Sequence, residues 1–444
     1  MKVIIGVENF GKIKKAEITL GRLLLFVGEN NSGKTFMMQL LYGITSAIIN
    51  DSKLLLKEAT DRGSDYIVDE EVLSLWEKDV NQYLEKNKEQ IVRDIFYKDI
   101  PIKKLYLKLD DINISYRVDV KKNKIIQVPE ADSINYRVEF YKINKDKIIN
   151  KLRMSLGGMF DKKSVEKFIA ETIVGDIFGT RFSDSSLFLP ASRTGMLLLY
   201  KYFFAEKDNK MYVFESNEAA QTVKNQLGLS APVYKFLQFL LRFTPDSLVN
   251  DKNQKILDYI ESNLIEGKLE LSNDETYYIP ENTEQRIPLY LSSSLINELA
   301  PIVKMLSSVY PYDNIYYDEI ETCLHPLKQK AMARLIIRLV NSGRRMVIST
   351  HSDSMAINLN NLLTFTMGDC SENLKEQKIK DLGLEDEDIL KTKDVHVYQF
   401  KNSSDGTSEV SELEFRNVNN LGYDFELFSQ NLENLTEDTI KIME

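Results

Sequence analysis

The chain has 444 residues, a length that accommodates two or three domains, or one large domain that carries insertions. Apolar residues make up 43% and charged residues 28%, so the composition excludes a disordered chain. The net charge of −10 gives no support for nucleic-acid binding and does not exclude a local basic groove. Two cysteines exclude a disulfide framework, and the lack of a signal pattern or an 18-residue apolar run predicts a cytoplasmic protein with no membrane span.

The amino-terminal part of the chain is predicted to begin with short strands. Residues 2–7, 16–20 and 23–28 are strand-like, and the last run, LLLFVG, leads into a glycine loop and then a helix over 36–48. A charged helical pattern covers about 70–100. Four β-rich runs are then expected to form a small antiparallel meander: KLYLKL, INISYRV, KIIQV and YRVEFYKI.

The carboxyl-terminal part is predicted to contain a helical insertion and a parallel sheet. Apolar spacing indicates helices over most of 196–265, interpreted as an inserted lid or arm, with a β-hairpin over 268–279. After residue 285 strands and helices alternate, which is typical of a parallel sheet flanked by helices. The tail is expected to complete the core with strand-like runs at 395–400 and 408–415 and a helical run at 425–435.

Residues 28–35, GENNSGKT, match the phosphate-binding pattern G-x-x-x-x-G-K-[ST] between an apolar strand and a helix. Glycines allow backbone amides to curl around phosphate, Lys34 is placed to reach the β and γ phosphates of ATP, and Thr35 to ligate Mg²⁺. The ATP-binding residues predicted from this loop are Gly28, Asn30, Asn31, Ser32, Gly33, Lys34 and Thr35.

Residues 313–319 form a β-rich run that ends in two carboxylates, Asp318 and Glu319. An acidic pair at the end of a strand is by itself more typical of a solvated surface. Beside a P-loop, the same pair is typical of a Walker B strand, so Asp318 is predicted to hold Mg²⁺ and Glu319 to deprotonate the attacking water.

The run DEIETCLHP, residues 318–326, resembles the Walker B and D-loop of ABC-type ATPases of the OLD (overcoming lysogenization defect) and SMC-like group. An E-x-x-LHP ending is common there, matched here by Glu321, Leu324, His325 and Pro326. LPASR at 189–193 resembles the group's Q-loop region, LSSS at 291–294 its signature motif and STHS at 349–352 its switch histidine. The resemblance covers roughly 1–40 and 186–360.

The resemblance assigns further site residues. It implies that His351 bonds the γ-phosphate and acts in catalysis with Glu319 and Lys34, although a histidine after a strand is by itself more often a surface or capping residue. It also implies that Ser292 and Ser293 contact nucleotide held by a second subunit. These serines are equally plain helix caps, and Ser294 stands where a glycine is usual.

For several polar residues the sequence is compatible with two roles. Arg193 either senses phosphate or couples the lid to the site, or is a salt-bridged surface residue, and Ser192 stands where the Q-loop glutamine is usual. Residues 12–15, KIKK, either contact nucleotide or DNA or form a solvated cluster. His325 is interpreted as a structural D-loop residue at a dimer contact rather than a metal ligand.

Together these features predict an α/β fold, a P-loop NTPase head of the ABC type with an antiparallel amino-terminal sheet and an inserted helical lid. The expected divisions are 1–195 and 286–365 for the two parts of the head, 196–285 for the lid or arm and 366–444 for a tail that completes the head or docks a partner. The resemblance implies an ATP- and Mg²⁺-dependent homodimer or higher homo-oligomer without membrane association.

The sequence is compatible with two functions. A nuclease domain within the chain is not expected, because the acidic stretch GLEDEDIL at 383–390 is more simply a solvated loop and helix start, and His325, His351 and His396 are too few for an HNH site. The first function is a regulatory ATPase of a prokaryotic anti-phage defence complex that controls a separate nuclease or toxin. The alternative is an SMC-like ATPase that acts directly on DNA during repair. The motor subunit of a membrane transporter is disfavoured by the LHP ending and the long insertions.

Overall fold

A computed structural model describes residues 1–52, 55, 60–61, 65–125, 133–145, 147–156, 161–180, 185–211, 228–272, 275–368, 372–416, 422–425, 437 and 440–442. The chain forms two compact units. The first comprises 1–20, 41–94 and 99–185, and the second comprises 21–40, 95–98 and 186–444. All the predicted ATP-site motifs fall in the second unit, while the four-part division remains a prediction.

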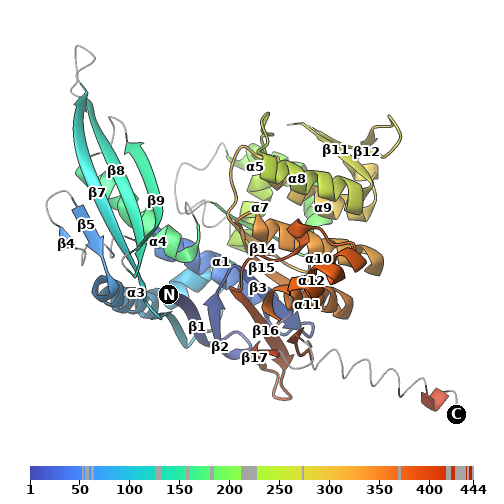
Figure 1. Ribbon diagram of the computed structural model, residues 1–444, viewed down its shortest axis with the longest axis horizontal. Helices are drawn as coiled ribbons and strands as arrows, with labels where there is room; N and C mark the ends of the chain where they lie inside the picture. The colour runs from blue at the N-terminus through green and yellow to red at the C-terminus, as the bar shows by residue number, and fades with distance from the viewer. Residues whose placement is uncertain are drawn as a thin grey trace. The chain divides into compact units, whose positions relative to one another are not determined.

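The second unit is built on a parallel sheet (Figure 1). Its strands, in spatial order, are β10 (Ser186–Leu189), β14 (Asn314–Tyr317), β15 (Arg345–Thr350), β3 (Leu23–Gly28) and β16 (Val395–Asn402), followed by β17 (Ser408–Leu413), which is antiparallel to β16. Strands β10, β14 and β3 are buried along their whole length. Apolar residues on both faces of a strand favour a sheet covered by helices on both sides, so the predicted α/β fold class is confirmed.

The helices of the second unit follow the apolar periodicity of the sequence. They are α1 (Lys34–Asn50), which continues into the first unit, α5 (Arg193–Met211), α7 (Ala231–Leu241), α8 (Asp251–Ile260) with the π-turn η1 (Glu261–Ile265), α9 (Ser294–Leu306), α10 (Pro326–Asn341), α11 (Asp353–Met367) and α12 (Glu372–Asp381). Within the described ranges, no helix combines the length and apolarity that a bilayer crossing requires.

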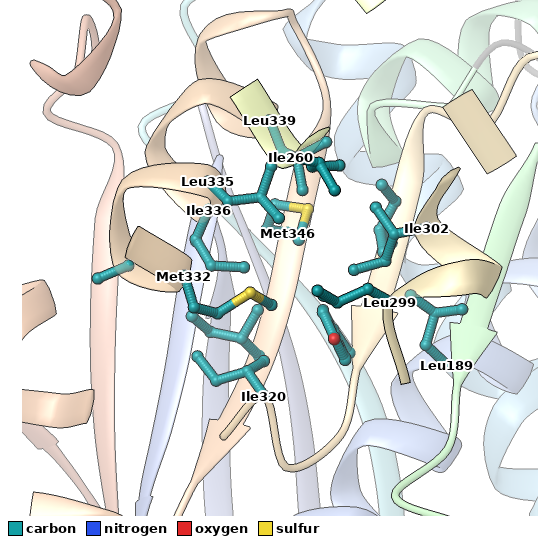
Figure 2. Packing of buried hydrophobic residues seen from close by; sticks show 14 of the residues in the cluster. Leu189, Ile260, Leu299, Ile302, Ile320, Met332, Leu335, Ile336, Leu339 and Met346 are labelled. Carbon is teal, nitrogen blue, oxygen red and sulfur yellow. The ribbon is translucent and has the colours of Figure 1, made fainter. Parts of the chain in front are cut away.

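The predicted lid is part of the core of the second unit. Figure 2 shows Ile260 of α8 beside Leu335 and Leu339 of α10, with Met346 of β15 below them. Phe236 of α7 is fully buried in the same cluster. The described part of this insertion is therefore packed into the head and does not form a free-standing arm.

The β-hairpin after this insertion is confirmed. Strands β11 (Gly267–Leu271) and β12 (Thr276–Pro280) pair antiparallel. The next strand-like run is divided into the short β13 (Ile287–Pro288) and the 3₁₀ turn η2 (Leu289–Leu291).

The first unit contains two antiparallel groups of strands and the helices α3 (Glu70–Phe96), whose last two residues belong to the second unit, and α4 (Lys162–Phe178). In one group β1 (Lys2–Phe10) pairs with β2 (Ile13–Leu20) and β6 (Lys104–Asp110). The other group has the order β4 (Thr60–Asp61), β5 (Asp65–Val68), β7 (Ile114–Ile125), β8 (Ser133–Asn144) and β9 (Lys147–Leu156).

The predicted meander is therefore wrong in two respects. KLYLKL is β6 and pairs with β1, a strand about a hundred residues earlier in the chain. INISYRV and the start of KIIQV form a single strand, β7, while residues 126–128 lie outside the described residues. Alternation of polar and apolar residues predicts a strand but does not choose its partner.

Two strands of the tail, β16 and β17, belong to the sheet. β16 pairs with β3 from Val395 beside Leu23 to Phe400 beside Gly28. The helix expected over 425–435 lies outside the described residues, except for Phe425.

The acidic stretch 383–390 was predicted to be solvated, and this is wrong for its last three residues, Asp388, Ile389 and Leu390, which are buried. Asp388 is fully buried at the end of the 3₁₀ turn η3 (Asp386–Asp388), and its Oδ1 lies 2.7 Å from Nε of Arg338. A second carboxylate, Glu385, lies 2.8 Å from the same guanidinium. The buried arginine on α10 compensates a charge that local sequence alone would place in solvent.

His396 of β16 is held between two carboxylates. Its Nδ1 lies 2.6 Å from Glu412 of β17, and its Nε2 lies 3.5 Å from Asp394. Burial lowers the pKa of His396, but hydrogen bonds to Asp394 and Glu412 outweigh this effect and raise the pKa to about 9.

We expect a pH-dependent contribution of His396 to stability. A raised folded-state pKa stabilises the fold fully below the unfolded value of about 6.5, and the effect is lost as the pH rises through about 9. His396→Gln should lower the free energy of unfolding by up to about 3 kcal/mol near pH ~6 and by little near pH ~10, measured by urea unfolding. A difference that does not vary with pH would contradict this.

Candidate nucleotide-binding site

The predicted motifs meet at one edge of the sheet in the second unit. Strands β3, β14 and β15 are parallel neighbours, and Tyr317, Ile348 and Leu25 lie side by side near their ends. The P-loop follows β3, the Walker B carboxylates follow β14 and the switch histidine follows β15. In open α/β sheets this carboxyl edge is where ligands bind.

The P-loop has the backbone that the motif requires. Gly28, Asn31 and Gly33 have φ values of 140°, 58° and 98°. Lys34 begins α1, is buried, and donates from Nζ to the carbonyls of Gly28 (2.8 Å) and Glu29 (2.7 Å). Burial lowers the pKa of Lys34, although Asp318 opposes the shift. The ammonium is thus held over the loop whose amides are suited to phosphate.

β16 explains why the first residue of the loop is glycine. A Cβ on Gly28 would lie 2.0 Å from the carbonyl oxygen of Phe400, an impossible contact with backbone. The tail also holds the loop directly, because Asn402 donates its backbone N–H to Glu29 (2.8 Å) and its side-chain amide to the carbonyl of Asn30 (3.1 Å).

We expect Gly28→Ala to destabilise the protein by about 3 kcal/mol, since both the positive φ and the contact with β16 must be relieved. Gly195→Ala is the matched control, because an added Cβ there meets nothing within 4 Å. It should change stability by less than about 1 kcal/mol. Thermal unfolding of the two variants makes the comparison, and equal melting temperatures would contradict the proposed role of β16.

Asp318 lies beside Thr35, as the predicted magnesium site requires. The Thr35 hydroxyl donates to Asp318 Oδ2 (2.8 Å), and the Ser349 hydroxyl donates to Oδ1 (2.6 Å). Burial raises the pKa of Asp318, against the two hydroxyl bonds. A buried carboxylate beside a threonine hydroxyl is an oxygen donor set that suits Mg²⁺, and a cation there would offset the cost of burial.

Glu319 is held in an unusual backbone conformation. Its φ is 48°, in the left-handed region that non-glycine residues rarely adopt. Its N–H donates to the Ser349 hydroxyl (2.8 Å), and its carbonyl accepts from the Thr322 hydroxyl (2.9 Å) and the Arg193 guanidinium (3.2 Å). These bonds hold the backbone of Glu319 in its strained conformation. The Glu319 side chain remains 36% exposed and open to substrate.

His351 is oriented by Glu321. One carboxylate oxygen of Glu321 lies 2.8 Å from the His351 backbone nitrogen and 3.1 Å from its Nδ1. Glu321 is buried, while the histidine ring remains 39% exposed. His351 Nδ1 is also 4.0 Å from Glu319, so the predicted base and the switch histidine share one site.

Arg193 is completely buried, so its interpretation as a surface residue is wrong. Its guanidinium donates to the carbonyls of Pro190 (2.8 Å) and Asp318 (2.6 Å), and lies 4.5 Å from the centre of the Tyr317 ring. Its Nε lies 2.7 Å from Glu298 of α9 in an ion pair whose angle does not meet hydrogen-bond geometry. Arg193 therefore joins the Walker B turn to the helix that follows the signature motif.

Two residues of this arrangement were not predicted. Ser349 was noted only within the histidine motif, yet it bonds both Asp318 and Glu319. Glu298 is 3% exposed and accepts from the Thr194 hydroxyl (2.7 Å) as well as pairing with Arg193. A carboxylate within the mostly apolar run LINELAPIVKML was the available signal.

The signature serines lie at an open helix end. Ser293 caps α9 without a side-chain hydrogen bond, and the Ser292 hydroxyl donates to Pro288 (3.3 Å). Asn297 donates to both serine carbonyls. These contacts of the two serines are with residues of neighbouring turns, Pro288 and Asn297, and their role toward nucleotide stays a prediction.

The remaining candidates have local contacts. His325 caps α10 by accepting the N–H of Leu327 (3.3 Å), in agreement with a structural role. Ser192 is exposed and directly precedes α5. In the first unit Lys15 pairs with Glu17 (3.0 Å), and the contact of residues 12–15 with nucleotide or DNA stays a prediction.

A parallel sheet that carries a P-loop after one strand and a buried aspartate, bonded to the P-loop threonine, after another defines an α/β P-loop NTPase. A family model described as AAA ATPase domain matches residues 1–356, and the chain belongs to this family. The protein is therefore an AAA-family ATPase.

Solved structures with detectable similarity include heads of SMC proteins. The SMC head bound to the C-winged helix domain of ScpA has 12% identity and a TM-score of 0.36, covering 93% of this chain and 97% of its own. The SMC head domain from Thermotoga maritima has 11% identity and a TM-score of 0.33, covering 93% and 100%. The SMC head with an extended coiled coil, bound to the C-terminal domain of ScpA derived from Pyrococcus furiosus, has 12% identity and a TM-score of 0.34, covering 100% of both chains. A search of curated proteins finds no match.

Proposed function

We propose that the protein hydrolyses ATP at this site, with Glu319 as the general base and His351 and Lys34 as further catalytic residues. The observation that carries the proposal is the contact of Thr35 with Asp318 beside the exposed carboxylate of Glu319. Asp318 and Glu321 are buried, whereas the Glu319 carboxylate is 36% exposed and available to accept the proton of water.

Each residue of the site has a separate role in the proposed reaction. The P-loop amides and Lys34 bind the phosphates, and Thr35 and Asp318 are placed to hold Mg²⁺, which neutralises charge on the phosphate oxygens when bound. Glu319 accepts a proton from the attacking water. In this proposal His351 hydrogen-bonds the γ-phosphate, and its contact with Glu321 supports the role by fixing the orientation of the ring.

We further propose that hydrolysis requires two copies, with Ser292 and Ser293 acting on nucleotide bound to the other copy. The open end of α9 supports this, together with Tyr290 and Leu291, which are 68% and 67% exposed beside the serines. Apolar side chains next to a helix end that lacks a side-chain cap bond favour coverage by a partner, and the first amides of such a helix favour an anion.

A mixing experiment tests the two-copy arrangement. Lys34→Ala disables the P-loop, and Ser293→Glu places a negative charge at the signature end, so each variant alone should be inactive. An equal mixture should recover about a quarter of wild-type turnover, since about half of the dimers are mixed and each has one intact composite site. No recovery in a mixture that forms dimers would overturn action in trans.

At the biological level we propose a regulatory subunit of a prokaryotic anti-phage defence complex, in which the nucleotide state controls a separate nuclease or toxin. Support comes from the motif resemblance. The test is co-expression with the product of a neighbouring nuclease or toxin gene. A stable complex that Glu319→Gln alters supports the proposal, while absence of any such complex overturns it.

A further inference from the structure

Strands β7, β8 and β9 lie next to one another in one sheet of the first unit (Figure 1), and they carry a block of basic residues. The strand register places three cross-strand rows next to one another: Arg117, Tyr141 and Lys151; Asp119, Glu139 and Arg153; Lys121, Arg137 and Ser155. Alternate residues of a strand point to opposite faces, so these side chains share one face. The other face packs on α4, where Phe140 contacts Phe168 and Tyr116 bonds Asp176.

The buried carboxylate of Glu139 forms ion pairs with the basic side chains around it. Its carboxylate accepts from the Tyr141 hydroxyl (2.6 Å) and lies 3.1 Å from Lys151, 2.8 Å from Arg153 and 2.9 Å from Arg137. Hydrogen bonds from Tyr141 and Lys151 lower the pKa of Glu139 to about 2, so it remains ionised at physiological pH. One negative charge thus holds three positive groups in one layer.

The basic block has an excess of positive charge, and its side chains are exposed to solvent. The five cations of the block outnumber its two carboxylates, Asp119 and Glu139, which leaves a net charge of +3, with Asp65 of β5 at its border. The side chains of Arg117, Arg137, Lys151 and Arg153 are between 40% and 54% exposed. In a chain of net charge −10 this is a local reversal of sign.

The chemistry of the block favours a regularly charged polymer over a folded protein. Protein interfaces are centred on apolar or aromatic anchors and are depleted of lysine. Here the ring of Tyr141 is already covered, with the Arg117 guanidinium 4.5 Å and the Lys151 ammonium 4.7 Å from its centre. What remains exposed is a flat set of cations, which suits repeated phosphates.

We propose that the basic block on β7, β8 and β9 binds the phosphodiester backbone of a nucleic acid without regard to base sequence. This goes beyond ATP hydrolysis and does not depend on it, since every residue of the block lies in the first unit. The proposal gives the protein a nucleic-acid binding site in addition to its ATP site.

The test is binding of the full chain, without nucleotide, to labelled duplex DNA, single-stranded DNA and RNA of one length, by fluorescence anisotropy at several salt concentrations. The variant is Lys121→Ala with Lys151→Ala and Arg153→Ala. Arg117 and Arg137 then remain to pair with Asp119 and Glu139, so that neither carboxylate is left alone.

The matched control is Lys162→Ala with Lys163→Ala and Lys167→Ala, three exposed lysines of α4 that change the net charge by the same amount. The block variant should bind about tenfold or more weakly, and the slope of log affinity against log salt should fall in magnitude by about 2 to 3. The control should keep the wild-type slope, and the nucleic acid that binds most tightly identifies the source of the phosphates.

Several results would overturn the proposal: no binding by the wild type, an unchanged block variant, an equal loss in the α4 control, or displacement by polyglutamate as effective as by unlabelled nucleic acid. If the triple variant fails to fold, Lys121→Glu and the charge-preserving Lys151→Arg replace it. The first should weaken binding and the second should retain it, and the reverse order rejects the site. ATP turnover is measured in parallel as a separate test of the proposed function, and its loss or retention does not affect the conclusion about nucleic-acid binding.

Discussion

Glu319→Gln should lower ATP turnover by on the order of 10²- to 10⁴-fold while leaving ATP binding intact, because the amide keeps the size of the side chain but cannot accept a proton. The backbone bonds of Glu319 to Ser349, Thr322 and Arg193 do not involve the carboxylate. The variant should therefore fold normally and accumulate in the ATP-bound state. Steady-state phosphate release and equilibrium binding of a labelled ATP analogue provide the two measurements.

Asp313→Asn is the matched control for this variant. Asp313 directly precedes β14, at the end of the strand remote from Glu319, so the same carboxylate-to-amide change there should leave turnover unchanged. If Glu319→Gln is as active as the wild type, the assignment of the general base is wrong. If it loses ATP binding as well, the carboxylate serves binding rather than proton transfer.

Breaking the buried pair of Arg193 and Glu298 should have the largest effect on stability. Arg193→Met leaves the Glu298 carboxylate buried without its cation, and Glu298→Leu leaves the guanidinium without its counter-charge. Removing one partner of a buried pair costs about 3–5 kcal/mol. Each single variant is expected to show a loss of this size in denaturant unfolding.

The double variant separates an ion pair from independent packing effects. Arg193→Met with Glu298→Leu should be less destabilised than the sum of the single changes by at least about 1 kcal/mol, because no unpaired charge remains. Additive losses would contradict the pairing. The double variant should still turn over ATP more slowly, with kcat reduced more than KM is changed, since the guanidinium no longer holds the Asp318 and Glu319 carbonyls.

The amino-acid sequence by itself determined the P-loop, the Walker B carboxylates and the alternation of strands and helices around them. These features are local, because a glycine loop between an apolar strand and a helix can be identified within about ten residues. The same holds for the carboxyl edge of the sheet, where parallel strands must bring their ends together. Thr35 and Asp318 are 283 positions apart and still meet there.

The tertiary structure alone decided the features that depend on distant partners. β6 pairs with β1, the lid helices join the core, and Asp388 is buried because Arg338 compensates its charge. Arg193 shows the reason most clearly, since its partners come from three separate segments of the chain. Hydrophobic periodicity reports which face of an element is buried, but burial of a charge depends on the group opposite it, and only the folded chain brings that group into place.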